Sequence, residues 1–134
     1  MTKLKGQCLC GQFSYESSAE PVATMVCHCK NCQRQSGAAF SVNVIVPADA
    51  LTMKGELKRF DDKADSGNIV VREFCAECGS PIFSRLSVNE AIAIIKAGTL
   101  DDTSMVTPGV EIWCDSKQDW VAPIADARFP QNPS

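Results

Sequence analysis

Cys27-His28-Cys29-Lys30-Asn31-Cys32 is the stretch around which this chain of 134 residues is organised. A cysteine pair lies on each side of it, Cys8-Leu9-Cys10-Gly11 before it and Cys75-Ala76-Glu77-Cys78-Gly79 after it. Seven of the eight cysteines therefore fall in three tight clusters. Four thiolates complete a tetrahedral zinc shell, whereas three leave one position open. The spacing predicts one closed metal site from the flanking pairs and one open site from the central triplet.

The flanking pairs have the spacing of chelating ligands. In Cys75-x-x-Cys78-Gly79 two intervening residues let both sulfurs face one ion, and the glycine permits a left-handed turn. Backbone N–H groups in such turns can donate to the thiolates. Cys8-x-Cys10-Gly11 is tighter, and a shared ion would cross-link two pairs that are separated by 64 residues. Two disulfides or four buried thiols are the alternatives.

The central triplet can place three sulfurs at three corners of a tetrahedron. A strand and a tight turn would aim Cys27 and Cys29 at one point, and Cys32 follows one turn later. An ion with an open fourth corner lowers the pKa of the group that it binds there. The alternative is a second structural site that His28 or Cys114 closes. A hydrogen bond or packing is the commoner role for such a histidine, and burial in an apolar strand for such a cysteine.

Length and composition limit the class of protein. A hydrophobic content of 45% fills one core, so we expect a single zinc-binding domain over residues 1–134. The chain shows no signal peptide and no apolar stretch of about 18 residues. We therefore expect no membrane partner and a cytoplasmic location, where thiols stay reduced. The formal charge of −3 argues against nucleic acid as a partner, because nonspecific binding needs a basic face.

Short strand-like runs dominate the chain and predict a mostly β fold. The runs are residues 4–7, 11–15, 22–26, 40–46, 51–54, 57–60, 69–74, 81–86, 91–97 and 110–114. Residues 30–36 lack β-branched side chains and predict one or two helical turns that Gly37 ends. The charged residues 61–68 predict an exposed loop, and residues 121–134 predict an irregular tail.

The three cysteine motifs, in this order, resemble those of the glutathione-dependent formaldehyde-activating enzyme family, to which centromere protein V also belongs. The resemblance includes Arg34 and Ser36-Gly37 after the triplet and Pro81-Ile82-Phe83 after the second knuckle. It runs over about residues 6–120, and residues 113–120 look like the family's closing segment. It implies a complex antiparallel β fold with zinc knuckles, similar to that of methionine-R-sulfoxide reductases.

The resemblance also implies two zinc ions and an activity. A structural zinc would be held by Cys8, Cys10, Cys75 and Cys78, and a catalytic zinc by Cys27, Cys29 and Cys32. The family's activity is that of a carbon–sulfur lyase, which joins glutathione and formaldehyde to S-(hydroxymethyl)glutathione and reverses that reaction. Many relatives have a histidine in the closing segment, where this chain has Val110-Glu111-Ile112.

A glutathione substrate would need cations for its two carboxylates. Lys30 and Arg34 beside the triplet are the first candidates, and Arg85 after the second knuckle is the next. Trp113 and Trp120 could wall a groove, although a buried core position is the default for tryptophan. The main rival is a non-catalytic double-zinc module that binds a partner protein. A sulfoxide reductase would depend on Cys114 as its redox cysteine, and a nucleic-acid-binding zinc ribbon would need a basic face.

Overall fold

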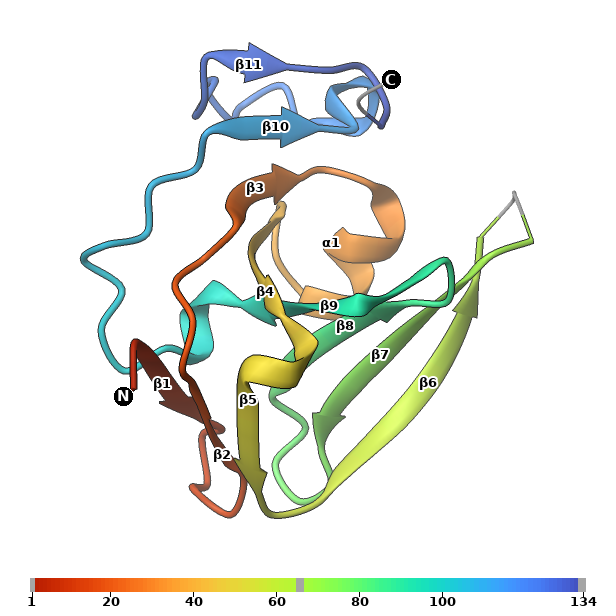
Figure 1. The fold of residues 1–134 in the computed structure, drawn as a ribbon. Helices are drawn as coiled ribbons and strands as arrows, with labels where there is room; N and C mark the ends of the chain where they lie inside the picture. Colours follow the sequence, from red (N-terminus) through yellow and green to blue (C-terminus); the bar gives the residue numbers. More distant parts are fainter. Residues whose placement is uncertain (1, 65–66, 133–134) are drawn as a thin grey trace.

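The computed structural model describes residues 2–64 and 67–132, which form two β-sheets and one α-helix (Figure 1). The strands are β1 (Leu4–Gln7), β2 (Ser14–Ser17), β3 (Ala23–Cys27), β4 (Ser41–Pro47), β5 (Leu51–Lys54), β6 (Leu57–Lys63), β7 (Ile69–Cys75), β8 (Pro81–Leu86), β9 (Asn89–Lys96), β10 (Val110–Ile112) and β11 (Ala127–Arg128). The helix is α1 (Lys30–Ser36), and the 3-10 turns are η1 (Ala48–Ala50), η2 (Ala97–Thr99) and η3 (Cys114–Ser116).

The strands pair in a small sheet and a large one. The small sheet has the order β1-β2-β5, and the large sheet has the order β11-β10-β3-β4-β9-β8-β7-β6. The pairs are antiparallel except at one edge, where β10 runs parallel to both β3 and β11. The predicted mostly β fold is confirmed, and the parallel edge is an addition to the expected antiparallel pattern.

The main hydrophobic core lies where the small sheet packs against the large one. Phe13 and Tyr15 on the small-sheet side meet Phe83 of β8, with ring centroids 5.9 Å and 5.2 Å apart. Val44 and Val46 of β4 complete this face of the large sheet. Because side chains alternate along a strand, the residues between them point to the opposite face.

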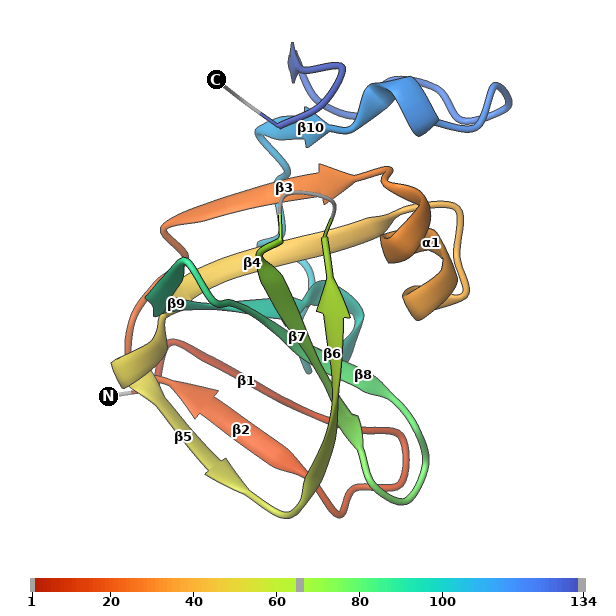
Figure 2. The same cartoon turned by 90° about the vertical axis from the view of Figure 1, so that its right-hand side faces the viewer.

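Helix α1 lies over that opposite face, close to the ends of β3 and β4 (Figures 1 and 2). Its first turn is capped by Cys29, whose side chain accepts a hydrogen bond from the N–H of Cys32 at 3.2 Å. Gly37 ends it in the left-handed region at φ 65°. The predicted helix and its glycine stop are both confirmed, because caps depend on residues only a few positions apart.

Several predicted boundaries are wrong. Strand β6 continues to Lys63, because residues 61–63 pair with residues 69–71 of β7, so the charged run is not wholly a loop. Strand β10 stops at Ile112, and Cys114 begins the turn η3 instead of ending a strand. The tail contains the strand β11, while residues 65–66 and 133–134 lie outside the described part of the chain. Within that part, no helix has the length and apolar character needed to cross a membrane.

Candidate metal centres

The flanking cysteines come together as four sulfurs within 4.8 Å of one another. Cys8 and Cys10 lie between β1 and β2, whereas Cys75 ends β7 and Cys78 lies between β7 and β8. The Sγ atom of Cys10 is 3.6 Å from that of Cys8 and 3.7 Å from that of Cys75. A tetrahedral zinc with Zn–S bonds of about 2.3 Å needs sulfurs about 3.8 Å apart, so the four thiols fit that ion.

The second knuckle has the geometry that its glycine predicts. Gly79 adopts φ 79°, and the N–H groups of Glu77 and Cys78 donate to Cys75 Sγ at 3.3 Å and 3.4 Å. The pKa of Cys78 is lowered to about 5, and the largest cause is the hydroxyl of Ser80, which lies 3.2 Å from Cys78 Sγ. These donors favour thiolates, the form in which cysteine binds metal. Each of the eight cysteines is within the described residues, and none forms a disulfide.

Gln12 is a neighbour of this cluster that the sequence did not indicate. Its Nε2 donates to Cys75 Sγ at 3.0 Å and to the carbonyl of Glu56 at 2.7 Å. Its Oε1 accepts from the N–H of Glu56 at 3.1 Å. The side chain thus ties the first knuckle to the turn between β5 and β6 and adds a donor to the sulfur.

The central triplet forms a second group within 4.8 Å, as the sequence predicted. Cys27 ends β3, Cys29 caps α1, and Cys32 lies in the first turn of that helix. The first and last are buried, and Cys29 is half-buried. No fourth His, Cys, Asp or Glu ligand joins the three in the part of the chain that the structure describes. The group therefore has the chemistry of a metal site with one open position.

The three thiols differ in their readiness to ionise. Hydrogen bonds with Cys29 and Cys32, together with burial, raise the pKa of Cys27. Hydrogen bonds from Cys27 and Cys29 lower the pKa of Cys32. Burial acts in the opposite direction, and the charges of Lys96 and Arg72 lower this pKa further. The positive charges near the triplet thus favour an anionic sulfur.

Arg72 and Lys96 are the cationic residues that the sequence analysis missed at this centre. Arg72 Nη1 lies 3.9 Å from Cys32 Sγ, and its Nε and Nη2 bind Asp62 Oδ2 at 3.0 Å and 2.9 Å. Lys96 Nζ donates to Asn43 Oδ1 at 3.1 Å. The two residues are only 5% and 6% exposed. In the sequence each is one charge in a strand-like run, so no local pattern marks it as buried.

His28 forms a hydrogen bond away from the triplet. Its Nε2 is 2.8 Å from Glu111 Oε1, and both side chains are fully buried. Cys114 lies within 4.8 Å of His28 and Glu111, a third group with metal-ligand side chains, and does not join the triplet. The expected hydrogen-bonding role of His28 is confirmed. The two residues that could have closed the central site belong to a different cluster.

The three predicted substrate-binding cations are placed differently. Lys30 and Arg34 are exposed on α1, beside the triplet. Arg85 of β8 donates from Nε to Glu73 Oε1 at 2.8 Å, and its guanidinium lies 5.3 Å from the centroid of the Phe83 ring. This is the core-facing side of β8, opposite to the α1 side. Lys30 and Arg34 each lie two positions from Cys32 on α1, whereas Arg85 lies on the other face of the sheet.

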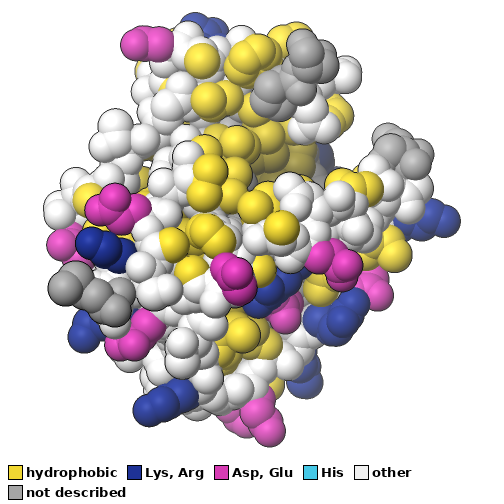
Figure 3. Space-filling model, in the orientation of Figure 1, with side chains coloured by type: hydrophobic (Ala, Val, Ile, Leu, Met, Phe, Trp, Pro, Cys, Tyr) yellow, Lys and Arg dark blue, Asp and Glu magenta, His cyan; other side chains and the backbone are white. Residues whose placement is uncertain are grey.

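The two tryptophans also differ. Trp113 is half-buried and packs against a small cluster that contains Cys27, Cys32 and Ile112. Figure 3 shows hydrophobic side chains around a hollow between the C-terminal segment and the body of the molecule. Trp120 is 76% exposed, so a buried core position is wrong for it.

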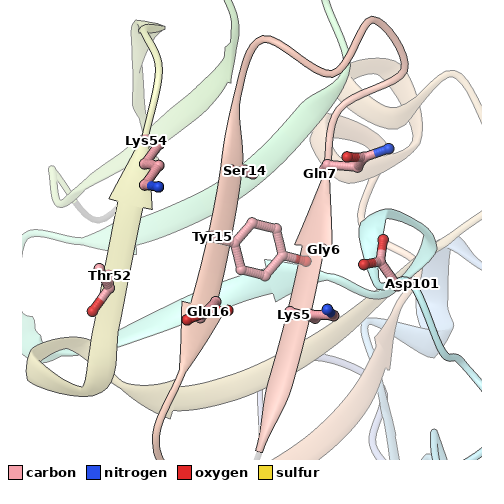
Figure 4. Close-up of a pocket in the computed structure, with 9 residues that line it drawn as sticks. All are labelled: Lys5, Gly6, Gln7, Ser14, Tyr15, Glu16, Thr52, Lys54 and Asp101. Carbon is pink, nitrogen blue, oxygen red and sulfur yellow. The ribbon is translucent and has the colours of Figure 1, made fainter. Parts of the chain in front are cut away.

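A pocket of about 290 Å³ lies on the three-stranded sheet (Figure 4). Its lining includes Lys5, Glu16, Lys54 and Asp101. Tyr15, which also borders it, bonds Thr99 Oγ1 at 2.7 Å, and burial raises its pKa to about 12. No cysteine lines this pocket, so it is separate from the two cysteine clusters.

Comparisons with known proteins identify a family and a fold to which the chain is similar. The profile of the family "Glutathione-dependent formaldehyde-activating enzyme" matches residues 3–116. Two fungal proteins are provisionally named as members of the same family. The one from Phaeosphaeria nodorum is 30% identical over 84 residues, 63% of this chain and 44% of that protein. The one from Podospora anserina is 29% identical over 85 residues, 60% of this chain and 38% of that protein.

The matched stretch thus spans less than half the length of these curated relatives. None of these matches singles out centromere protein V. A crystal structure of a Rhodobacter sphaeroides protein has the same fold, with a TM-score of 0.57 and 16% identity. That similarity covers 93% of this chain and 98% of the other.

Proposed function

Because the chain belongs to the glutathione-dependent formaldehyde-activating enzyme family, we propose that it is a zinc-dependent carbon–sulfur lyase. It would add a thiol such as glutathione to an aldehyde such as formaldehyde and reverse that addition. The observation that carries the proposal is the triplet of Cys27, Cys29 and Cys32. Its three sulfurs lie within 4.8 Å of one another, and no fourth protein ligand joins them among the described residues.

We propose two zinc ions per chain. Cys8, Cys10, Cys75 and Cys78 would hold a structural ion, which their sulfur spacing and backbone donors suit. The triplet would hold the second ion. When bound, that ion would supply a positive charge and an open position, which favour a thiol substrate in its deprotonated form.

The residues around the triplet would orient its sulfurs and bind the substrate. Arg72 holds Cys32 in place and is itself fixed by Asp62, so the guanidinium offers a permanent positive charge beside the sulfurs. Lys30 and Arg34 are exposed on the helix that carries Cys32, where they would bind the carboxylates of glutathione. Arg85 lies on the other face of the sheet and is engaged by Glu73, so we assign it no contact with the substrate.

The reaction is tested directly by exchange NMR. Zinc-loaded protein, glutathione and ¹³C-formaldehyde are mixed, and the rate of exchange between formaldehyde and S-(hydroxymethyl)glutathione is measured. The protein should accelerate this exchange well above the rate in buffer. Cys29→Ser should abolish the acceleration, and Cys114→Ala should preserve it. A wild-type protein that leaves the rate unchanged would contradict the proposal.

Binding of the thiol is tested by cobalt substitution. Glutathione should change the visible absorption of the cobalt protein as a fourth sulfur reaches the second metal. Cys29→Ser should lose that change, and a folded Cys75→Ser should retain it. A non-catalytic double-zinc module predicts the opposite: two metals and a spectrum that small thiols do not affect.

A further inference from the structure

The face of the large sheet beneath α1 carries a row of buried polar side chains. The strand register places Ser41 opposite Cys27, Asn43 opposite Lys96 and Ser84 opposite Arg72. Residues directly opposite each other on neighbouring antiparallel strands point to the same face. The Arg72–Cys32 contact identifies this face as the one that α1 covers. The polar row therefore lies beside the cysteine triplet.

Hydroxyl groups in this row lack hydrogen-bond partners. Ser41 and Ser84 are each 3% exposed, yet no described residue lies within hydrogen-bond reach of either Oγ atom. Among the described residues, Lys96 has one hydrogen-bond acceptor, Asn43 Oδ1, although its ammonium group carries three N–H donors. Buried polar groups nearly always have partners, so donors left over at one place indicate an acceptor that the protein does not supply.

Two of these groups lie at the triplet. Ser41 is opposite Cys27, and Lys96 is diagonal to Ser41 across the β4–β9 pair, within reach of a long side chain. The charge of Lys96 acts on all three thiols of the triplet. Ser84 lies two strands away from Ser41, opposite Arg72 and diagonal to Lys96 across the β8–β9 pair. Lys96 and Ser41 thus offer a cation and a hydroxyl on the sheet side of the three sulfurs.

We propose that Lys96 and Ser41 bind the oxygen of the aldehyde substrate, an assignment that rests on the proposed lyase function. In the addition, the substrate thiolate forms a carbon–sulfur bond at the aldehyde carbon, and the π electrons of the carbonyl move to its oxygen. The ammonium of Lys96 and the hydroxyl of Ser41 stabilise the resulting negative charge. The alkoxide then takes a proton from solvent, which replaces the proton that the thiol released. The reverse reaction uses the same contacts.

Support of the metal ligands is the competing role for these residues. A Ser41 hydroxyl that donated to the Cys27 thiolate would strengthen metal binding, and its loss would weaken it. An oxygen-binding Ser41 has no effect on the metal. Because Ser41 lacks a protein partner, Ser41→Ala should also leave the melting temperature unchanged or slightly higher.

The test uses formate as a probe of the oxygen position. Formate binding to the zinc-loaded protein with saturating glutathione is followed by calorimetry, and zinc affinity by competition with a chromophoric chelator. Lys96→Met should weaken formate binding about tenfold or more, and Ser41→Ala should weaken it several-fold. Zinc affinity of Ser41→Ala should equal that of the wild type.

The chain offers matched controls. Ser84→Ala removes an equally buried, equally unpartnered hydroxyl from the same face, two strands away from Ser41, and should change formate binding less than about twofold. Lys58→Met removes an exposed charge from β6 and should have no effect. An equal loss in Ser84→Ala, or a fall in zinc affinity in Ser41→Ala, would overturn the assignment.

Failure of this inference differs from failure of the proposed function. If the wild type accelerates glutathione–formaldehyde exchange and Lys96→Met does so equally well, the lyase function stands and the oxygen site is overturned. If the wild type accelerates no exchange while formate binding still requires Lys96 and Ser41, the lyase function is overturned. Lys96 and Ser41 would then form an anion-binding site whose natural ligand is not an aldehyde.

Discussion

His28 Nε2 lies 2.8 Å from Glu111 Oε1 in the interior of the protein, and neither side chain is exposed to solvent. The other carboxylate oxygen accepts hydrogen bonds from the N–H groups of Ile124 and Ala125 at 2.7 Å and 2.9 Å. One buried carboxylate therefore joins the cysteine triplet, strand β10 and the C-terminal segment, which lies above β3 in Figure 1.

The first prediction concerns the stability that this carboxylate supplies. Glu111→Gln replaces an anion that accepts three hydrogen bonds with an amide that cannot accept all of them. The free energy of unfolding should fall by about 3 kcal/mol, since each hydrogen bond to a buried charge contributes about 1.5–3 kcal/mol and the losses are not additive. Urea denaturation measures it. Glu90→Gln, at an exposed position of β9, is the control and should unfold like the wild type.

The second prediction is the pH dependence of that stability. Burial alone would raise the pKa of Glu111, but the N–H of Ala125, the bond to His28 and the N–H of Ile124 lower it below 4.5. A lowered carboxyl pKa gives stability that is complete above the unfolded value and is lost as pH falls through the folded value. The stability difference between wild type and Glu111→Gln should therefore shrink below about pH 4.5. A difference that stays constant down to pH 3 would refute this.

The third prediction separates the two metal sites by thermal melting. Cys75→Ser removes a buried ligand that links the β1–β2 turn to the β7–β8 turn, so its melting temperature should fall sharply. Cys29→Ser removes a ligand of the second ion but retains a side-chain oxygen at the N-cap of α1, a position that serine suits. It should lose one metal in elemental analysis and remain folded. Equal melting temperatures would instead mark the central site as structural.

The fourth prediction concerns the cation beneath the triplet. Arg72→Met removes the positive charge that lies between Cys32 and Asp62, leaving two anionic groups near each other. Affinity for the second zinc should fall about 10–100-fold, as for other groups that contact metal ligands. Chelator competition measures it. Arg59→Met removes an arginine of the adjacent strand that pairs with exposed Asp61, and its zinc affinity should match the wild type.

The fifth prediction tests how closely β1 packs against the turn η2 and the side chain of Tyr15. A Cβ atom at Gly6 would lie 2.3 Å from the carbonyl oxygen of Thr99 and 2.4 Å from the hydroxyl of Tyr15. Gly6→Ala should therefore destabilise the protein by about 3 kcal/mol or more. Gly98→Ala, where a Cβ meets no atom within 4 Å, should change the unfolding free energy little. Chemical denaturation of the two variants compares them.

Features that depend on a few neighbouring residues were predictable from the sequence. The approach of Cys75 to Cys78, the left-handed turn at Gly79 and the end of α1 at Gly37 all follow from local spacing. The extension of β6 to Lys63 was missed because pairing with β7 outweighs the local preference of charged residues for loops. The burial of His28 could not be predicted from its neighbours in the sequence, because its partner Glu111 lies 83 positions away.

The sequence by itself determined the three cysteine motifs and the succession of strands, because both depend on short-range spacing and alternation. Only the tertiary structure decided what surrounds the central triplet. Cross-strand register and the position of α1 bring Arg72, Lys96 and Ser41 to three sulfurs from another part of the chain. Burial then gives those charges and hydroxyls their effect, because a cation removed from water acts more strongly on a neighbouring thiolate than the same cation on the surface.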